Sequence, residues 1–292
     1  MKGREIDVLR HVFKKPQKQN FKGKIKFMNT MYGTVRYLDT GDESNEVIIN
    51  APDGPNVIEH HEKLICELSK KFRVVCFEFP GTGFSYPNLK YGYSLEDGVA
   101  ILFQVMDLLE IQKASLLLSC SNGLYGIMAA QTKSSRVNYL FLSQTCSLDS
   151  FDQWSNKSIP KMLRYPYFGQ VVNLVLIKKL TEKWYQYSLP KTTNKSKFES
   201  LALNAIDSGA CFCLSSLVQG LQKGKNSLLK VTETPSVLFW GKKDYTHRKT
   251  SSYSITEHLP NCEIIELPDC GHFPELENTK KYLEIVFDRL EK

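Results

Sequence analysis

Ser121 has the sequence surroundings of a catalytic nucleophile. It lies in Ser119-Cys120-Ser121-Asn122-Gly123, between a short apolar run at residues 116–118 and an apolar helical pattern that follows. A serine on so sharp a turn takes a strained backbone conformation, and its neighbours must be small because the helix starts almost on top of the strand. The segment predicts a nucleophile elbow, with Ser119 where the motif usually has glycine. An ordinary strand-to-helix turn would explain the same residues. The choice between the two interpretations depends on whether the chain also contains a suitable base and acid.

A serine hydroxyl is a poor nucleophile at neutral pH and needs an adjacent base that is oriented by an acid. Of the six histidines, His272 lies in a loop, residues 268–274, directly after a predicted strand and before the final helix. Sites in open parallel sheets collect at the carboxyl ends of the strands. His272 is therefore the expected general base.

Two aspartates are candidates for the orienting acid. Asp244 follows a predicted buried strand at residues 236–240, and Asp149 follows the strand at residues 137–142. The order nucleophile, acid, histidine along the chain fits both. Asp244 is the preferred acid and Asp149 the alternative.

The elements that would position these residues alternate between strand and helix. Short β-branched and aliphatic runs predict strands, and apolar residues at 3.6-residue spacing predict helices. Such alternation predicts an α/β fold with a mostly parallel, doubly wound sheet. The predicted strands cover residues 24–29, 33–39, 47–50, 73–79, 114–118, 137–142, 236–240 and 263–267, and the clearest helices cover residues 95–109, 124–131 and 283–290.

Residues 148–232 break this alternation. They contain helical patterns at residues 171–180, 201–206 and 211–221, and no good strand pattern. We interpret them as a helical cap inserted after the sixth strand, with residues 21–147 and 233–292 forming the core. Residues 1–20 form a basic leader that could contain a short helix ending before Pro16.

Composition excludes several classes of protein. The 292 residues are 42% hydrophobic, and no run of about 18 apolar residues predicts a membrane span. The charged first residues do not resemble a secretory signal. The eight cysteines lack metal-type spacing and are expected to be mostly buried, reduced thiols in a cytoplasmic protein, so that no metal is expected. Oligomeric state is not predicted.

The net charge of +7 is concentrated in the middle of the chain. Residues 151–232 contain 12 Lys or Arg against 4 Asp or Glu. A solvated basic face would explain this excess, as would attraction of an anionic substrate, a carrier protein or a membrane surface. Nucleotide and nucleic-acid binding are not expected, since the glycine-rich segment at residues 80–85 matches no phosphate-binding motif and no nucleic-acid-binding motif occurs.

With these motifs together, residues 24–292 resemble a capped, single-domain α/β-hydrolase-fold protein. The resemblance rests on the loop after Asn50, the segment at residues 80–85, the elbow, Trp240-Gly241-Lys242-Lys243-Asp244, and Gly271-His272-Phe273. It implies that Ser121 is the nucleophile, His272 the base and then the acid, and Asp244 the orienting carboxylate. Relatives that open epoxides or displace halide place aspartate at the elbow.

The resemblance therefore implies a serine hydrolase that cleaves an ester, thioester, amide or C–C bond through an acyl-enzyme, without a cofactor. The substrate would carry a small to medium acyl group and could be carboxylated or carrier-bound. The alternative activity is that of an acyltransferase, which would pass the acyl group to an acceptor other than water.

The oxyanion hole departs from the family pattern. The backbone N–H of Asn122 and one from the loop after Asn50 should hold the oxyanion, but Pro52 has no N–H. Ala51 is the expected substitute. Asp53 through a shifted loop, or the Asn50 side chain, are other possibilities. If the hole is incomplete, the protein would instead be a catalytically weak ligand-binding or interaction protein.

Overall fold

The computed structural model describes residues 3–13, 25–223 and 229–291. Its main sheet has the order β1-β2-β4-β3-β7-β8-β10-β11, with β6 (Tyr86–Pro87) beside β2. Strands β1 and β6 pair antiparallel with β2, as β2 does with β4, and all other pairs are parallel. The eight long strands are β1 Ile25–Thr30, β2 Gly33–Thr40, β3 Val47–Ala51, β4 Arg73–Phe77, β7 Ala114–Ser119, β8 Val137–Ser143, β10 Ser236–Gly241 and β11 Glu263–Leu267.

This architecture confirms the predicted fold class. Each predicted strand is present to within two residues at its ends, except that Lys24 lies outside the described residues. The central strand β7 is buried along its whole length, as expected for a strand covered on both faces.

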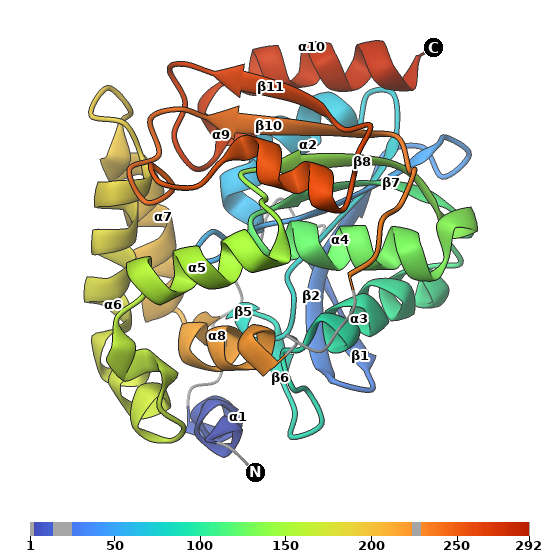
Figure 1. Cartoon of the computed structure of the whole chain (residues 1–292). Coiled ribbons are helices and arrows are strands. Elements are labelled where there is room, and N and C mark those ends of the chain that lie inside the picture. Colours follow the sequence, from blue (N-terminus) through green and yellow to red (C-terminus); the bar gives the residue numbers. More distant parts are fainter. Residues whose placement is uncertain (1–2, 14–24, 224–228, 292) are drawn as a thin grey trace.

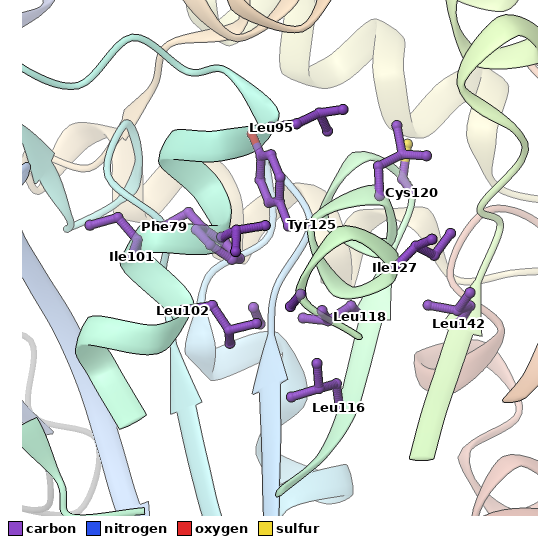
Figure 2. Packing of buried hydrophobic residues seen from close by; sticks show 14 of the residues in the cluster. Phe79, Leu95, Ile101, Leu102, Leu116, Leu118, Cys120, Tyr125, Ile127 and Leu142 are labelled. Carbon is purple, nitrogen blue, oxygen red and sulfur yellow. The ribbon is translucent and has the colours of Figure 1, made fainter. Parts of the chain in front are cut away.

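Helices cover both faces of the sheet (Figure 1). One layer contains α3 (Leu95–Leu108) and α4 (Ser121–Thr132), which pack on one large apolar cluster. Figure 2 shows Leu116 and Leu118 of β7 beneath these two helices, with Cys120 at the end of the strand. The opposite cluster includes residues of α2 (Glu62–Leu68) and α10 (Thr279–Leu290). The sheet is thus doubly wound.

A mainly helical segment connects β8 to β10. It comprises α5 (Leu148–Ser158), α6 (Phe168–Ser188), α7 (Lys195–Asp207) and α8 (Leu214–Lys223). The expectation of no strand here is wrong, because β9 (Cys211–Phe212) pairs antiparallel with β5 (Thr82–Gly83). The predicted helix at residues 211–221 accordingly begins later, at Leu214.

The N-terminal helix α1 (Arg4–Phe13) agrees with the short helix considered for the leader, whose residues 14–20 lie outside the described part of the chain. Arg10 donates to the carbonyl of Ala210, and Ser216 to the carboxylate of Asp7, so α1 is packed against the helical segment. The remaining elements are the short helix α9 (Pro274–Glu277) and 3-10 turns at Ile58–His61, Ser134–Arg136, Lys161–Arg164 and Ser252–Glu257. Among the described residues, no helix has the length and apolar character needed to cross a membrane.

Candidate active site

The turn between β7 and α4 contains a single strained residue, Cys120. Its φ of 50° and ψ of −121° lie in a region that residues with side chains rarely adopt. Its N–H donates to the Ser143 carbonyl at 2.8 Å, and its carbonyl accepts from the Thr145 hydroxyl at 3.2 Å. A Cβ on Gly123 would lie 2.1 Å from Thr145 Oγ1, so that position must be glycine.

The prediction that Ser121 takes the strained conformation is therefore wrong. Ser121 is the first residue of α4, one position beyond the turn. Both residues line the same cavity. The two side chains are adjacent in sequence, but it is Cys120 that occupies the elbow position, where a nucleophile would stand.

His272 and Asp244 form a buried hydrogen-bonded pair. The distance from His272 Nδ1 to Asp244 Oδ2 is 2.6 Å, and the side chains of both residues are fully buried. Asp149, the alternative acid, interacts instead with His258. The structure thus brings Asp244 to His272, as the sequence predicted for the preferred acid.

Gln144 and Thr246 hold the Asp244 carboxylate in place. Gln144 Nε2 donates to Oδ2 at 3.1 Å, and both the N–H and the hydroxyl of Thr246 donate to Oδ1. Burial disfavours the charged form of Asp244, but His272 and Thr246 outweigh it, so the pKa of Asp244 lies below its usual value. Asp244 is therefore a fixed anion beside His272.

A second carboxylate, that of Asp53, faces the opposite side of the His272 ring. Asp53 Oδ2 lies 3.4 Å from His272 Nε2. The sulfur of Cys120, a ring nitrogen of His272 and an oxygen of Asp53 all lie within 4.8 Å of one another. Burial of His272 opposes its charged form, but Asp244 and Asp53 outweigh this effect and raise its pKa well above the usual value.

The Cys120 thiol is held in its protonated form. Burial raises its pKa to about 11, and the charge of Asp53 adds to this effect, against an opposing interaction with His272. Since the thiolate is the reactive form, Cys120 needs a base to accept its proton.

The loop after β3 differs from the predicted oxyanion hole. Gly54 and Ser121 line the cavity, whereas the expected donors Ala51 and Asn122 do not. Ala51 pairs with β7 as the last residue of β3, and Asn122 donates through its side chain to the Pro52 carbonyl at 3.1 Å. The N–H of Ser121, at the start of α4, faces the Cys120 sulfur.

An apolar cavity of about 190 Å³ opens from the elbow toward the helical segment. Trp184 of α6 forms one wall and meets the edge of the His272 ring at a centroid distance of 4.9 Å. The cavity is lined mostly by side chains of α5, α6, β9 and α8, together with the site residues; its apolar lining comprises Phe151, Trp154, Ile159, Pro160, Leu180, Trp184, Tyr187, Phe212, Leu214 and Leu217.

A second, more polar cavity adjoins the first. The two share Trp154, Ser158, Tyr187 and Thr246. Its lining adds hydroxyl groups and the cations Lys157, Arg248 and Lys249, with no acidic residue among the described residues that line it. An anionic group is therefore favoured there.

Two groups of side chains have the composition of a metal site: Asp53 with Cys120 and His272, and Asp244 with His247 and His272. In the second group, the 2.6 Å bond between Asp244 and His272 already engages the facing atoms. His247 stacks on Trp154, and burial lowers its pKa to about 3. Its neutral ring therefore packs beside the pair.

Sequence reasoning did not identify Cys120, Gln144, Thr246 or His247, and it considered Asp53 only as a backbone donor. The sequence feature that could have indicated Cys120 is its position just after the predicted strand, which ends near Ser119. The glycine at position 123 favoured Ser121 instead, because it completes the usual spacing. Gln144 had no comparable signal, since its contacts with Asp244 span 100 residues.

Comparisons with known proteins agree with the fold described above. A family model described as alpha/beta hydrolase fold matches residues 52–279. Among curated proteins, none matches this chain in sequence.

Solved structures similar to this one include a putative acyltransferase from Salmonella enterica (TM-score 0.77, 15% identity, 94% of this chain and 97% of that chain). An enol-lactonase from Burkholderia xenovorans has a TM-score of 0.66 at 15% identity, over 91% and 100% of the two chains. A Bacillus megaterium epoxide hydrolase has a TM-score of 0.65 at 17% identity, over 91% and 100%. At these identities the likeness shows the fold alone.

Proposed function

Since this chain belongs to the α/β-hydrolase fold family, we propose that it is an acyl hydrolase in which Cys120, His272 and Asp244 act as nucleophile, base and orienting acid. The observation that supports this proposal is the strained backbone of Cys120 at the elbow, with His272 beside its sulfur. The bonds cleaved would be esters, thioesters, amides or C–C bonds next to a carbonyl.

The first half-reaction begins with His272 in its neutral form. Nε2 accepts the thiol proton of Cys120 while the sulfur attacks the substrate carbonyl carbon, and the carbonyl π electrons move to oxygen. The backbone N–H groups of Ser121 and Gly54, two residues that line the cavity, would donate to that oxygen. When the intermediate collapses, the leaving group takes the proton from His272 and an acyl-thioester remains on Cys120.

Water completes the cycle. His272 accepts a proton from water, which attacks the acyl-thioester carbon, and Cys120 leaves as the thiol after the proton returns from Nε2. Asp244 stays ionised throughout and stabilises the transient imidazolium. The raised pKa of Cys120 makes this general-base step necessary, because little thiolate exists before substrate binds.

The cavities suggest the substrate class. The apolar cavity would hold a small to medium acyl group, and the adjoining basic cavity would hold an anionic leaving part. A thioester of a phosphate-bearing carrier combines the two features. The eight free cysteines further support a reducing compartment, so a cytoplasmic location is part of this proposal.

Ser121 remains the second candidate nucleophile, because it lines the same cavity. An activity screen with p-nitrophenyl esters and acyl-coenzyme A thioesters, run on the wild type, Cys120→Ala and Ser121→Ala, separates the two. We expect Cys120→Ala to lower kcat/KM by at least about 10³-fold and Ser121→Ala by less than about tenfold.

Labelling provides an independent readout. Mass spectrometry after iodoacetamide treatment at alkaline pH should find an alkyl group on Cys120 of folded protein, besides the one expected on the exposed Cys66, and a fluorophosphonate should leave Ser121 unmodified. The reverse pattern would restore Ser121 as nucleophile. Tight, stoichiometric ligand binding without turnover of any acyl substrate would instead support a binding protein, a function that the Asp53 carboxylate in the site would favour.

A further inference from the structure

Asp53 carries a carboxylate into the place where the proposed reaction develops negative charge. It lies two residues beyond the end of β3, and only 7% of its surface is exposed. Its Oδ2 lies 3.4 Å from His272 Nε2, the nitrogen that must accept the thiol proton, and the Gly54 N–H faces the same carboxylate. Asp53 therefore engages both the base and a donor of the oxyanion site.

An ionised Asp53 would oppose the proposed chemistry. A substrate oxyanion formed beside it would be repelled, and the Cys120 thiol would resist deprotonation. The groups that face Asp53 are Cys120 from the elbow, Tyr125 from α4, Tyr185 from α6 and His272 from the loop before α9. Of these, His272 alone can be cationic, so the charge state of Asp53 is tied to that of His272.

We propose that Asp53 is a further catalytic residue, which shares one proton with His272 and donates it as a hydrogen bond to the substrate carbonyl oxygen. The inference rests on the proposed acyl transfer to Cys120. In the free protein the shared proton lies on His272 Nε2, paired with the Asp53 carboxylate. When substrate binds, this proton moves to Asp53 Oδ2 and His272 becomes the neutral base.

The protons balance through the first half-reaction. The Asp53 O–H points to the substrate oxygen, as a neutral carboxylic acid kept in an apolar site can do. The thiol proton then moves to Nε2, the C–S bond forms, and the oxyanion is held by Asp53 and by the Ser121 and Gly54 N–H groups. Burial raises the pKa of Asp53, against opposing effects of His272 and the Gly54 N–H, which is consistent with a neutral working form.

The active form thus carries one proton on the Asp53–His272 pair, and activity should depend on pH in a bell shape. At low pH both groups are protonated and no base is present. At high pH the pair has lost its proton, so Asp53 repels the oxyanion. Asp53→Asn keeps an N–H donor that cannot ionise, and Asp53→Ala removes the donor.

The experiment compares kcat/KM against pH for the wild type, Asp53→Asn and Asp53→Ala with a p-nitrophenyl ester. We expect Asp53→Asn to lose the alkaline limb and to shift the acid limb to higher pH, because this limb then reports protonation of His272 itself instead of protonation of the Asp53 carboxylate beside a cationic His272. At pH values above the wild-type optimum, kcat/KM of Asp53→Asn should exceed that of the wild type about tenfold. Asp53→Ala should also lose the alkaline limb. Its plateau value of kcat/KM should be about 10²–10³-fold lower than that of Asp53→Asn, because the alanine cannot donate to the oxyanion.

The proposal would be overturned if Asp53→Asn kept the alkaline limb, or if the asparagine variant were inactive at every pH while still folded by circular dichroism. A substrate-free readout is the pH midpoint of Cys120 alkylation by iodoacetamide, which should fall in Asp53→Asn; an unchanged midpoint also contradicts the proposal. Failure of the proposed function is distinguishable, because wild-type Cys120 would then carry no acyl group in single-turnover mass spectrometry.

Discussion

At the scale of single residues, the site depends on a shift of one position. Cys120 and Ser121 are both small and both follow the same strand, but only Cys120 has the positive φ of the elbow. Ser121 instead starts α4, where its N–H is free of an intrahelical partner. With Cys120 instead of Ser121 as the proposed nucleophile, the expected covalent intermediate is a thioester instead of an ester.

The orienting acid can be identified by replacing each candidate with its amide. Asp244→Asn should lower kcat by roughly 10²–10⁴-fold, because an amide no longer stabilises the His272 imidazolium or fixes its tautomer. Asp149→Asn is the matched control and should change kcat by less than about twofold, since Asp149 interacts with His258 instead. Steady-state kinetics on both variants measure the difference. Equal losses in the two variants would remove Asp244 from the proposed mechanism.

At the scale of secondary structure, the elbow is joined to α9 by a side-chain hydrogen bond. Ser119, the last residue of β7, donates to Glu275 Oε1 at 2.9 Å. Glu275 is buried, and burial raises its pKa to about 7 from an ordinary value of 4.5. The position that usually holds glycine in the elbow motif thus anchors the strand to a buried acid.

Glu275 should make the stability of the fold depend on pH. Its pKa is higher in the folded than in the unfolded protein, so its contribution is complete below pH 4.5 and is lost as pH rises through about 7. Glu275→Gln cannot ionise. Relative to the wild type, its free energy of unfolding should therefore increase between pH 4.5 and 8, by up to about 3 kcal/mol.

Urea denaturation at pH 5 and pH 8 measures this change. Glu284→Gln, an exposed position on α10, is the control and should follow the wild type at both pH values. If the stability of Glu275→Gln relative to the wild type were the same at the two pH values, the carboxyl group would not titrate as described.

Most of the strands could be predicted from the sequence because they are short β-branched or aliphatic runs. His272 and Asp244 could be predicted because each lies in the loop that follows such a strand. The elbow could be located to within one residue, but the start of α4 depends on how β7 packs against β8, which no local pattern records. β9 has two residues, too few for a periodicity. Asp53 could not be assigned a place because its position depends on the path of the loop after β3.

At the scale of the whole molecule, positive charge accumulates where the proposed substrate would enter. The second, more polar cavity is lined by three cations, Lys157, Arg248 and Lys249. Lys157 belongs to α5, and the other two follow β10. Lys157, one of the basic residues of segment 151–232, therefore lines the same cavity as two cations from the C-terminal part of the chain.

Replacing Lys157 and Lys249 together by glutamine should lower kcat/KM for an acyl-coenzyme A thioester about 30-fold, since each cation adds about 1 kcal/mol of attraction near water. The loss should shrink as ionic strength rises. A neutral p-nitrophenyl ester of the same acyl group should be unaffected, and Lys191→Gln, away from both cavities, is the control. Equal effects on neutral and anionic substrates would exclude the anionic class.

The small sheet of β5 and β9 also determines how the cavity can open. It joins a core loop to the helical segment, and the Cys213 N–H adds a bond to the Gly81 carbonyl at 2.8 Å. The helical segment is thus attached to the core by strand pairing as well as by its two chain connections. A hinge that swung the entire segment away would break this attachment, together with the bonds from the Trp154 ring to the Thr246 carbonyl and from the Tyr185 hydroxyl to the Asn56 side chain.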